Sequence, residues 1–308
     1  MSEISRAAAC ARQQFPQGSY LLNEEMKKHT SFKIGGEVAC FVEPASFEEL
    51  KNIAGKLREA NVKPLILGNG TNLLVDDVPL DIAVIKTSKL CEIRALGETE
   101  VFAQCGATLS RLAVFAYERG LSGLEFAHGI PGTVGGAVLM NAGAYGGEMA
   151  GVVKEVTFLT RELEIKTAGA EELAFSYRHS RFEEGSEIVL SAVLSLEKGN
   201  TGDIKSRMDK LSRKRRESQP LNLPSAGSTF KRPENGYAAA MIDEAGLKGF
   251  RTGGAQVSEK HAGFVVNTGG ASFSDVISVM EHVRETVLKK HGVLLEPEVR
   301  IISEKTFF

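Results

Sequence analysis

The chain has 308 residues, of which 25% are charged and 43% hydrophobic, and its formal net charge is −2 at pH 7. This composition is typical of a globular protein with room for two or three domains, and the charge gives no electrostatic footprint for nucleic acid. Because no run of eighteen apolar residues occurs and residues 1–16 lack the apolar core of a signal peptide, we expect no membrane span and a cytoplasmic location.

The four cysteines, Cys10, Cys40, Cys91 and Cys105, are spread over the first third of the chain. No two of them have C-x-x-C spacing, and no histidine lies near enough in sequence to complete a zinc site. We therefore expect buried thiols of a reducing compartment and no metal.

A β-α-β unit is predicted after a polar N-terminal arm. Glu37–Val42 is strand-like, and Ser46 and Glu49 form a capping box for a helix. The apolar face of this helix consists of Leu50, Ile53, Ala54 and Leu57. The next strand, Leu65–Leu67, runs into the turn Gly68–Asn72, so this turn lies at the carboxyl end of a strand, where ligands are commonly bound.

The sequence GNGTN at Gly68–Asn72 is typical of a phosphate-binding turn that follows a strand directly. It is not the usual dinucleotide fingerprint, because G-x-G-x-x-G fails at Leu73, and the chain contains no G-x-x-x-x-G-K-[ST] motif.

The most glycine-rich segment is Gly123–Gly147, GLEFAHGIPGTVGGAVLMNAGAYGG, which contains eight glycines and no charged residue after Glu125. Glycine lets backbone N–H groups approach a ligand closely, which predicts a cradle for a pyrophosphate or a flat ring. A turn-rich loop between strands is the alternative. Together with Gly68–Asn72, the segment indicates a cofactor held by two parts of the chain.

The middle of the chain alternates between strands and helices. Strands are predicted at Ile82–Lys86, Val101–Cys105, Val152–Thr160 and Ile188–Leu196, and a helix at Leu109–Glu118. The segment Lys205–Arg216 has seven basic residues and one acidic residue, and we expect a helix with a solvated face. A positive approach for an anionic ligand and an RNA-binding patch remain alternatives.

Beyond a linker at residues 219–224, the pattern predicts a separate compact unit. A helix should end at Gly246, a strand should cover His261–Asn267, and a second helix should begin near Ser274 and end at Gly292. Val299–Ile302 would form the last strand. This alternation suits a small α/β substrate-binding domain.

Five motifs occur in an order that resembles one enzyme family. They are GNGTNLLV, the whole Gly123–Gly147 segment, FSYRHSRF at Phe175–Phe182, PSAGSTFKRP at Pro224–Pro233 and LEPEVR at Leu295–Arg300. Over roughly residues 20–302 they resemble UDP-N-acetylenolpyruvoylglucosamine reductase, which acts in bacterial peptidoglycan precursor synthesis. The length is similar to that of the family's shorter second type.

The resemblance implies an α+β protein with a two-part FAD-binding fold of the vanillyl-alcohol-oxidase-like (PCMH) kind and a C-terminal α/β substrate-binding domain. The implied boundaries are 20–85 and 86–210 for the two FAD-binding subdomains and 218–303 for the substrate domain. FAD would be bound non-covalently, and NADPH would be the co-substrate. The implied partners are small molecules, with no nucleic acid or membrane, and we expect a monomer.

By the same resemblance, backbone and side chains of the two glycine segments would hold FAD. The implied cofactor residues are Gly68, Asn69, Gly70, Thr71, Asn72, Ile130, Pro131, Gly132, Thr133, Gly136, Asn141 and Ala142.

The implied reaction reduces the enolpyruvyl ether of a UDP-sugar to a lactyl ether. Arg178 matches the family's carboxylate-binding arginine, Ser228 its proton donor to the α-carbon, and Glu298 the glutamate that bonds to the enolic carboxyl group. Tyr177 and Lys231 would contact substrate. Without the motifs, Arg178 would be interpreted as part of a surface ion pair and Ser228 as a turn serine, and packing remains the alternative for Tyr177.

Three further residues qualify the resemblance. Arg232 stands where the family commonly has Asn, and Glu296 is a neighbouring acid that we expect to face solvent. His128 could in principle anchor a flavin covalently, but a packed or exposed histidine is expected. A different flavin oxidase or dehydrogenase on the same scaffold, or a silent nucleotide- or RNA-binding protein, remain the alternative functions.

Overall fold

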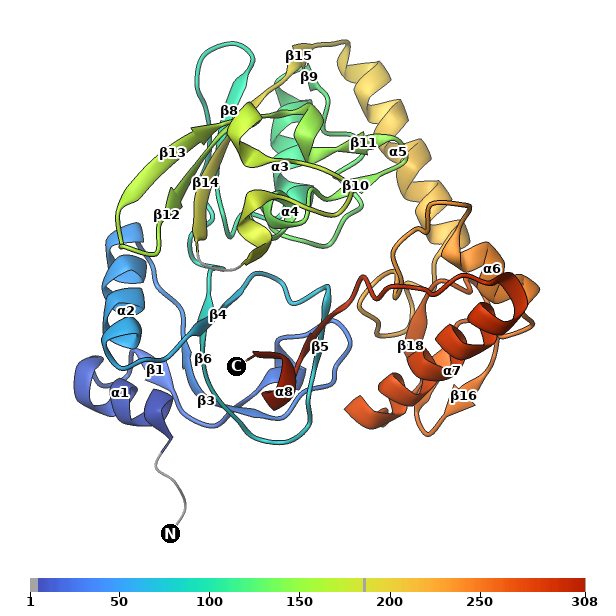
Figure 1. Ribbon diagram of the computed structural model, residues 1–308. Helices are drawn as coiled ribbons and strands as arrows, with labels where there is room; N and C mark the ends of the chain where they lie inside the picture. The colour runs from blue at the N-terminus through green and yellow to red at the C-terminus, as the bar shows by residue number, and fades with distance from the viewer. Residues whose placement is uncertain (1–4, 185–186, 308) are drawn as a thin grey trace. The chain divides into compact units, whose positions relative to one another are not determined.

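The computed structural model describes residues 5–184 and 187–307 (Figure 1). The chain forms two compact units, and each is made of separate segments. The first unit comprises the chain up to Leu22, Cys40–Asn69 and Ile82–Arg215. The second comprises Asn23–Ala39, Gly70–Asp81 and the chain from Arg216 onward. This division by contacts differs from the three consecutive segments predicted from the sequence, whose boundaries stay a prediction.

The N-terminal arm forms a helix, α1 (Arg6–Gln14), which the sequence analysis did not predict. Ser5 caps it, since its Oγ accepts a hydrogen bond from Ala8 N at 3.1 Å. Its buried side chains are small: Ala7, Ala8, Cys10 and Ala11. Such a helix packs closely although its sequence looks polar.

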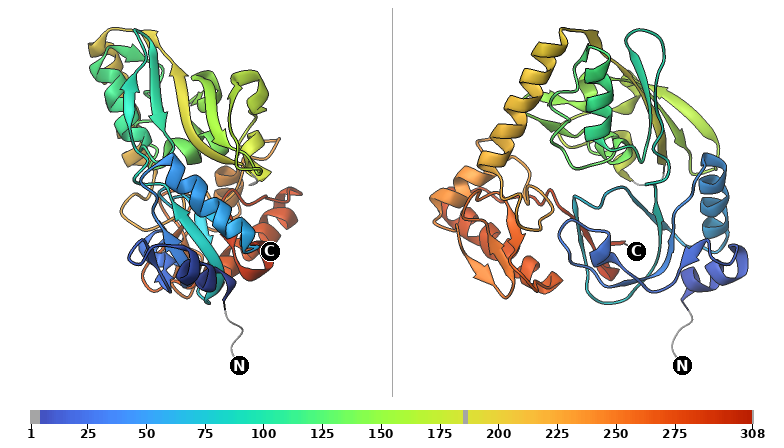
Figure 2. Two further views of the ribbon diagram at one scale, coloured as in Figure 1. Left: turned by 90° about the vertical axis from the view of Figure 1, so that its left-hand side faces the viewer. Right: turned by 180° about the vertical axis from the view of Figure 1, so that it is seen from behind.

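The predicted capping box of the next helix, α2 (Phe47–Glu59), is present. Ser46 Oγ accepts from Glu49 N at 3.1 Å, and Glu49 Oε2 accepts in turn from Ala45 N at 2.7 Å. The buried residues are the four predicted ones, Leu50, Ile53, Ala54 and Leu57. Figure 2 shows α2 lying across the strands of its sheet.

That sheet has the strand order β1-β3-β6-β4, with β2 paired to β3. The strands are β1 (Tyr20–Leu21), β2 (Glu24–Glu25), β3 (Glu37–Val42), β4 (Pro64–Leu67) and β6 (Leu80–Lys86). β4 and β6 are parallel, with Leu67 opposite Lys86. β4 therefore ends directly before Gly68, which confirms the predicted place of the first glycine turn.

A second five-stranded sheet is antiparallel, in the order β13-β12-β14-β8-β7. Its strands are β7 (Ile93–Ala95), β8 (Glu100–Gln104), β12 (Val153–Leu159), β13 (Ile165–Gly169) and β14 (Ile188–Ser195). The three strands predicted here agree with the structure to within a residue at each end. The two edge strands were not predicted, because most of their side chains face solvent and carry little apolar alternation.

Helices and short strands complete the first unit. They are α3 (Leu109–Glu118), β9 (Leu121–Ser122), α4 (Val134–Leu139), β10 (Gly143–Ala144), β11 (Gly147–Glu148), η2 (Met149–Gly151), η3 (Ala170–Leu173), η4 (Arg181–Glu184), β15 (Glu197–Lys198) and α5 (Thr201–Ser218). α3 has the predicted bounds. α4 packs against β14 and lies inside the glycine-rich segment, where no helix was predicted.

The second unit is built around α7 (Phe273–His291), which packs on a small antiparallel sheet (Figure 1). The strand order is β16-β17-β18, with β16 (Arg251–Thr252), β17 (Ala255–Val257) and β18 (Val265–Asn267). The strand predicted at His261–Asn267 is confined to its last three residues, because Phe264 N donates to His261 O and closes a turn. α6 (Ala238–Glu244) lies against α7.

A parallel pair, β5 (Leu73–Val75) and β19 (Arg300–Ile302), explains why the second unit is discontinuous. η1 (Met26–Lys28) precedes it, and α8 (Glu304–Phe307) ends the chain. The buried core of this unit combines residues from all three of its segments, such as Phe32, Leu74 and Phe230. Among the helices that the structure describes, none is long and apolar enough to cross a membrane.

Candidate active site

The two glycine segments meet within the first unit. Asn69 Nδ2 donates to Pro131 O at 2.8 Å, and a Cβ on Gly68 would lie 2.3 Å from Thr133 Oγ1. Residues about sixty positions apart in sequence are therefore in contact. The sequence analysis predicted that the two segments hold the same cofactor, but it did not predict this direct contact. A side chain at position 68 would force the segments apart.

The loop that follows β8 holds the second glycine segment through backbone hydrogen bonds. Val134 N donates to Ala107 O and Gly135 N donates to Cys105 O, both at 2.8 Å. A Cβ on Gly135 would lie 2.9 Å from Cys105 Cβ. Gly135 is thus required by packing within the protein.

Gly136 differs from its neighbours in the same segment. The nearest atom to a Cβ built on Gly136 is Thr133 Oγ1 at 3.7 Å, an ordinary contact distance. By contrast, a Cβ on Gly147 would lie 2.6 Å from the ring of Phe126. Gly136 therefore has no packing requirement for glycine from the protein, which fits the close approach of a ligand to its backbone.

The remainder of the first glycine turn belongs to the second unit. Gly70 has φ +61°, and a Cβ there would lie 2.1 Å from His29 O. Asn72 follows: its Nδ2 donates to Glu298 O at 3.0 Å, and its own carbonyl accepts from Arg300 N at 3.0 Å. The turn is thus joined to the strand segment that carries Glu298.

Arg178 lies in a tight turn of the first unit. Ser176 and His179 exchange two backbone hydrogen bonds of 3.1 Å, and Arg178 between them has φ +55°, which is unusual for a residue with a side chain. Its Nη1 donates to Gly143 O at 3.4 Å, and its guanidinium lies 5.3 Å from the ring centre of Tyr177. A half-exposed cation on a strained backbone is typical of a ligand-binding group.

Asn141 connects this turn to the end of α4. It is buried, with 1% of its surface exposed. Its Nδ2 donates to Ser176 O at 3.0 Å, and its Oδ1 accepts from Ala150 N at 2.9 Å. The neighbouring Ala142 is also buried, and its N–H donates to Ala137 O. The predicted cofactor contacts of these two residues stay a prediction, but the Asn141 amide clearly serves the protein backbone.

Ser228 and Glu298 are carried by two paired segments of the second unit. Glu298 N donates to Thr229 O and Lys231 N donates to Glu296 O, both at 2.8 Å. This backbone pairing brings residues seventy positions apart onto neighbouring segments. Ser228 and Glu298 are both half-buried.

Two further charged residues lie close in sequence to this pair. Glu296 has 73% of its side chain exposed, as expected for a residue that faces solvent, and it lies 3.7 Å from Lys231 Nζ. Arg232 is exposed, donates to Gly236 O and lies over the ring of Tyr237.

The basic segment is helical and mostly solvated, as predicted, and forms part of α5. One of its arginines, Arg207, pairs with the buried carboxylate of Glu125 at 3.0 Å. His128 Nδ1 lies 3.1 Å from Ser212 Oγ, so this histidine is a partly buried contact of the helix. Arg207 and Ser212 thus attach α5 to the start of the glycine segment.

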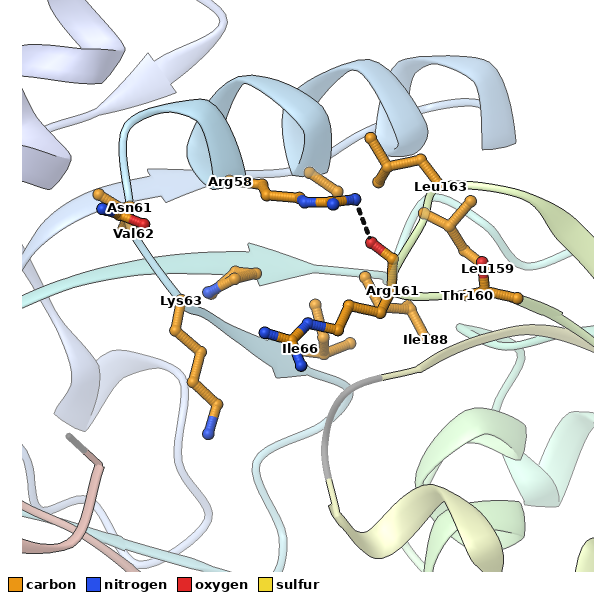
Figure 3. Close-up of a pocket in the computed structure, with 12 residues that line it drawn as sticks. Arg58, Asn61, Val62, Lys63, Ile66, Leu159, Thr160, Arg161, Leu163 and Ile188 are labelled. Atoms are coloured by element: carbon orange, nitrogen blue, oxygen red, sulfur yellow. Dashed lines mark hydrogen bonds between the residues drawn. The ribbon is translucent and has the colours of Figure 1, made fainter.

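A cavity of about 620 Å³ lies in the first unit, alongside β4 (Figure 3). Its wall includes the apolar side chains of Ile66, Leu159 and Ile188, and its basic groups are Arg58, Lys63 and Arg161. Arg58 Nη1 donates to Arg161 O, which fixes the turn after β12. The sequence analysis did not find these basic residues, because they are isolated from one another in sequence. None of the predicted cofactor residues is among those that line this cavity.

The buried cysteines are unreactive thiols. Cys10, Cys40 and Cys105 are buried, as predicted, whereas Cys91 is partly exposed. Burial raises the pKa of Cys40 and of Cys105 to about 12, so both thiols stay protonated at neutral pH. Within residues 5–184 and 187–307, no cluster of His, Cys, Asp or Glu side chains could hold a metal ion.

Comparison with known proteins identifies the domains. Residues 38–169 match the FAD binding domain family, and residues 219–302 match the family described as UDP-N-acetylenolpyruvoylglucosamine reductase, C-terminal domain.

Curated relatives match along almost the whole chain. The UDP-N-acetylenolpyruvoylglucosamine reductase of Caldanaerobacter subterraneus subsp. tengcongensis is 49% identical over 289 residues, which cover 94% of this chain and 95% of the relative. The enzyme of the same name from Pediococcus pentosaceus is 46% identical and covers 94% and 97%.

A solved structure supports the same assignment. The crystal structure of UDP-N-acetylenolpyruvylglucosamine reductase (MurB) from Thermus caldophilus superposes with a TM-score of 0.79 at 35% identity, over 92% of this chain and 98% of that one. The α+β FAD-binding fold and the C-terminal domain expected from the sequence are thereby confirmed. The chain belongs to the UDP-N-acetylenolpyruvoylglucosamine reductase family.

Proposed function

We propose that this protein reduces UDP-N-acetylglucosamine enolpyruvate to UDP-N-acetylmuramate, with NADPH as the source of electrons and FAD as bound cofactor. The family assignment supports this reaction, which serves peptidoglycan synthesis and hence cell-wall formation, cell shape and division. The carbon–carbon double bond gains a hydride at its β-carbon and a proton at its α-carbon, while NADPH becomes NADP⁺.

The residues of the first unit fit FAD. The Gly68 turn and the Pro131–Thr133 turn lie in contact, and Gly136 leaves its backbone open to close approach. Ile130, and Gly70–Asn72 of the second unit, would add backbone contacts. When bound, the flavin supplies a two-electron carrier between NADPH and substrate.

Arg178 would bind the carboxylate of the enolpyruvyl group, with Tyr177 beside it. A planar guanidinium can donate two parallel hydrogen bonds to a carboxylate, which a lysine cannot. Hydride addition at the β-carbon moves electron density toward this carboxylate, so a fixed cation stabilises the charge that develops. The turn that holds Arg178 at φ +55° supports this role.

Ser228 would deliver the proton to the α-carbon, and Glu298 would bond to the carboxyl group from a neighbouring segment. A hydroxyl is a weak acid at neutral pH, so close placement and a nearby cation are required. Lys231 lies three residues after Ser228 and would supply that positive charge.

The observation that carries the proposal is the backbone pairing between Thr229 and Glu298 at 2.8 Å. It brings together two motifs that have no sequence proximity, PSAGSTFKRP and LEPEVR, and that the same family uses for substrate.

The test is an anaerobic two-step experiment. The bound flavin is first reduced with NADPH, and UDP-N-acetylglucosamine enolpyruvate is then added while the flavin absorbance is followed. Rapid return of the oxidised spectrum, with UDP-N-acetylmuramate as the product, is expected. Flavin that stays reduced after addition of this substrate would refute the proposed reaction.

We also propose that the enzyme acts as a cytoplasmic monomer and needs neither a nucleic acid nor a membrane. All of its reactants are water-soluble nucleotides, and Arg207 of the basic helix is occupied by Glu125. The domains 20–85, 86–210 and 218–303 would each contribute to the reaction. Light scattering of the purified holoenzyme should give the mass of one chain, and a larger mass would contradict the monomer.

A further inference from the structure

Two asparagines predicted to bind FAD donate hydrogen bonds to the backbone of the segments that carry substrate-binding residues. In the first unit, Asn141 Nδ2 donates to Ser176 O, two residues before Arg178. In the second unit, Asn72 Nδ2 donates to the carbonyl of Glu298 itself. Both bonds are 3.0 Å long. A cofactor segment is thus tied to a substrate segment twice, by the same chemical group.

Asn141 has only one workable amide orientation. Its oxygen accepts from Ala150 N at 2.9 Å, and its nitrogen donates to Ser176 O. A backbone N–H cannot accept and a backbone carbonyl cannot donate, so exchanging the amide oxygen and nitrogen would lose both bonds. Since Asn141 is buried, each lost bond would leave an unsatisfied polar group.

The bond to Ser176 anchors the turn that carries Arg178. Ser176 and His179 close the turn through two backbone bonds, and Arg178 is held in the left-handed region between them. A displacement of Ser176 therefore rotates the peptide units on both sides of Arg178. The guanidinium would then leave its place beside Gly143 O and the ring of Tyr177.

Asn72 holds Glu298 in a similar way. Its amide donates to Glu298 O, while its carbonyl accepts from Arg300 N at 3.0 Å. Glu298 N in turn donates to Thr229 O, next to Ser228. Both backbone polar groups of Glu298 are therefore fixed, one by the glycine turn and the other by the serine segment.

We propose that Asn141 and Asn72 are positioning residues, which act on the substrate through Arg178 and Glu298 respectively. Their side-chain amides couple the conformation of the cofactor segments to the orientation of the Arg178 and Glu298 side chains. This inference rests on the proposed function. Its consequence is that either asparagine affects the substrate half-reaction much more than the NADPH half-reaction.

The test replaces each amide by an isosteric carboxylate, in Asn141→Asp and Asn72→Asp. The substitution keeps the size and the acceptor oxygen but removes the donor that each backbone carbonyl requires. Both substitutions also add a negative charge, as the Asn267→Asp control does, and both lie in predicted cofactor segments, so the rates of the two half-reactions are compared within the flavin-loaded fraction of each variant. The rate of flavin reduction by NADPH should stay within about two-fold of wild type. Reoxidation of the reduced flavin by UDP-N-acetylglucosamine enolpyruvate should slow by about ten-fold or more. Equal slowing of both half-reactions would overturn the proposal.

Double-mutant cycles separate positioning from a general structural effect. If Asn141 acts through Arg178, the effect of Asn141→Asp should largely disappear in an Arg178→Lys background. Asn72→Asp should behave likewise in a Glu298→Gln background. Effects that simply multiply in the double variants would refute the coupling.

Asn267 provides the matched control, because it is a buried asparagine with the same arrangement of bonds. Its Nδ2 donates to Phe32 O at 3.1 Å, and its Oδ1 accepts from Gly269 N at 2.9 Å. Asn267→Asp should lower the melting temperature but leave substrate-dependent reoxidation unchanged; comparable slowing there would contradict the inference. A wild-type enzyme whose flavin is not reoxidised by this substrate would refute the proposed function itself, whereas an active wild type with equally active Asn141 and Asn72 variants would refute only the coupling.

Discussion

Single glycines in the segment Gly123–Gly147 serve different purposes, which their number alone does not reveal. Gly135 and Gly147 are required because a Cβ would collide with Cys105 and Phe126. Gly136 has no such neighbour. The glycine density of this segment therefore has packing causes, at Gly135 and Gly147, in addition to the predicted approach of a ligand.

Replacing Gly136 should separate ligand approach from folding. Gly136→Ala lies inside α4 and should stabilise the apoprotein by about 0.5–1 kcal/mol, because alanine loses less backbone entropy in a helix. The added methyl group should weaken FAD binding by about ten-fold, since it fills the space for a close ligand. Both are measurable, by chemical unfolding of the apoprotein and by flavin titration.

Gly151→Ala is the control for this experiment, because a Cβ at position 151 would meet no atom within 4 Å. It should bind FAD like wild type. Unchanged FAD affinity in Gly136→Ala would mean that the backbone there does not approach the cofactor.

Ser228 is the single hydroxyl on which the second half-reaction depends. Ser228→Ala should leave flavin reduction by NADPH intact and slow flavin reoxidation by substrate by roughly 10²–10⁴-fold, the range typical of a lost proton donor. Stopped-flow absorbance measures both steps. Ser225→Ala removes a hydroxyl from the same segment and should leave both rates unchanged. Wild-type reoxidation in Ser228→Ala would remove Ser228 from the mechanism.

At the scale of elements, the start of α7 shows how local sequence specifies a helix. Ser272 Oγ accepts from Asp275 N at 3.1 Å, and Asp275 Oδ2 accepts from Ser272 N at 3.0 Å and from Gly254 N at 3.2 Å. These bonds lower the pKa of the Asp275 carboxyl group, and the bond from Ser272 N has the largest effect. One capping box thus joins the helix to the turn between β16 and β17.

Removing this cap should destabilise the protein measurably. Ser272→Ala should lower the free energy of unfolding by about 1 kcal/mol, because the N–H of Asp275 loses its partner. The same substitution at Ser278, an exposed position inside α7, should be neutral or slightly stabilising, since alanine favours a helix interior. Denaturant titration measures the free energy of unfolding of both variants. Equal free energies of unfolding for the two variants would show that the cap does not stabilise the protein.

For the whole molecule, His261 should contribute to the loss of stability in mild acid. Burial lowers its pKa, and its Nδ1 accepts from Gly263 N at 3.2 Å, which only the unprotonated nitrogen can do. The unfolded chain binds a proton at about pH 6.5, before the folded chain does, so the stabilising contribution is complete above that pH and is lost as the pH falls.

His261→Asn should flatten this part of the pH profile, because an amide oxygen can accept from Gly263 N without titrating. The measurement is the free energy of unfolding of both proteins between pH 5 and about 8. Parallel profiles for the two proteins would exclude a contribution from His261.

The sequence by itself determined the elements whose signals are local. The capping residues and apolar face of α2, the bounds of α3 and the strand before Gly68 depend on neighbouring residues, and all were predicted. The family and its cofactor were also predictable, because five motifs keep their order along the chain.

Only the tertiary structure decided which distant segments share a unit. Gly70–Asp81 joins the C-terminal segment because β5 pairs with β19, and Thr229 meets Glu298 through backbone bonds that no side-chain pattern encodes. The edge strands were missed because their exposed side chains lack periodicity, and the bonds of Asn141 and Asn72 because an amide can serve ligand or backbone equally well. Long-range backbone pairing depends on the whole chain, and for that reason local sequence could not specify it.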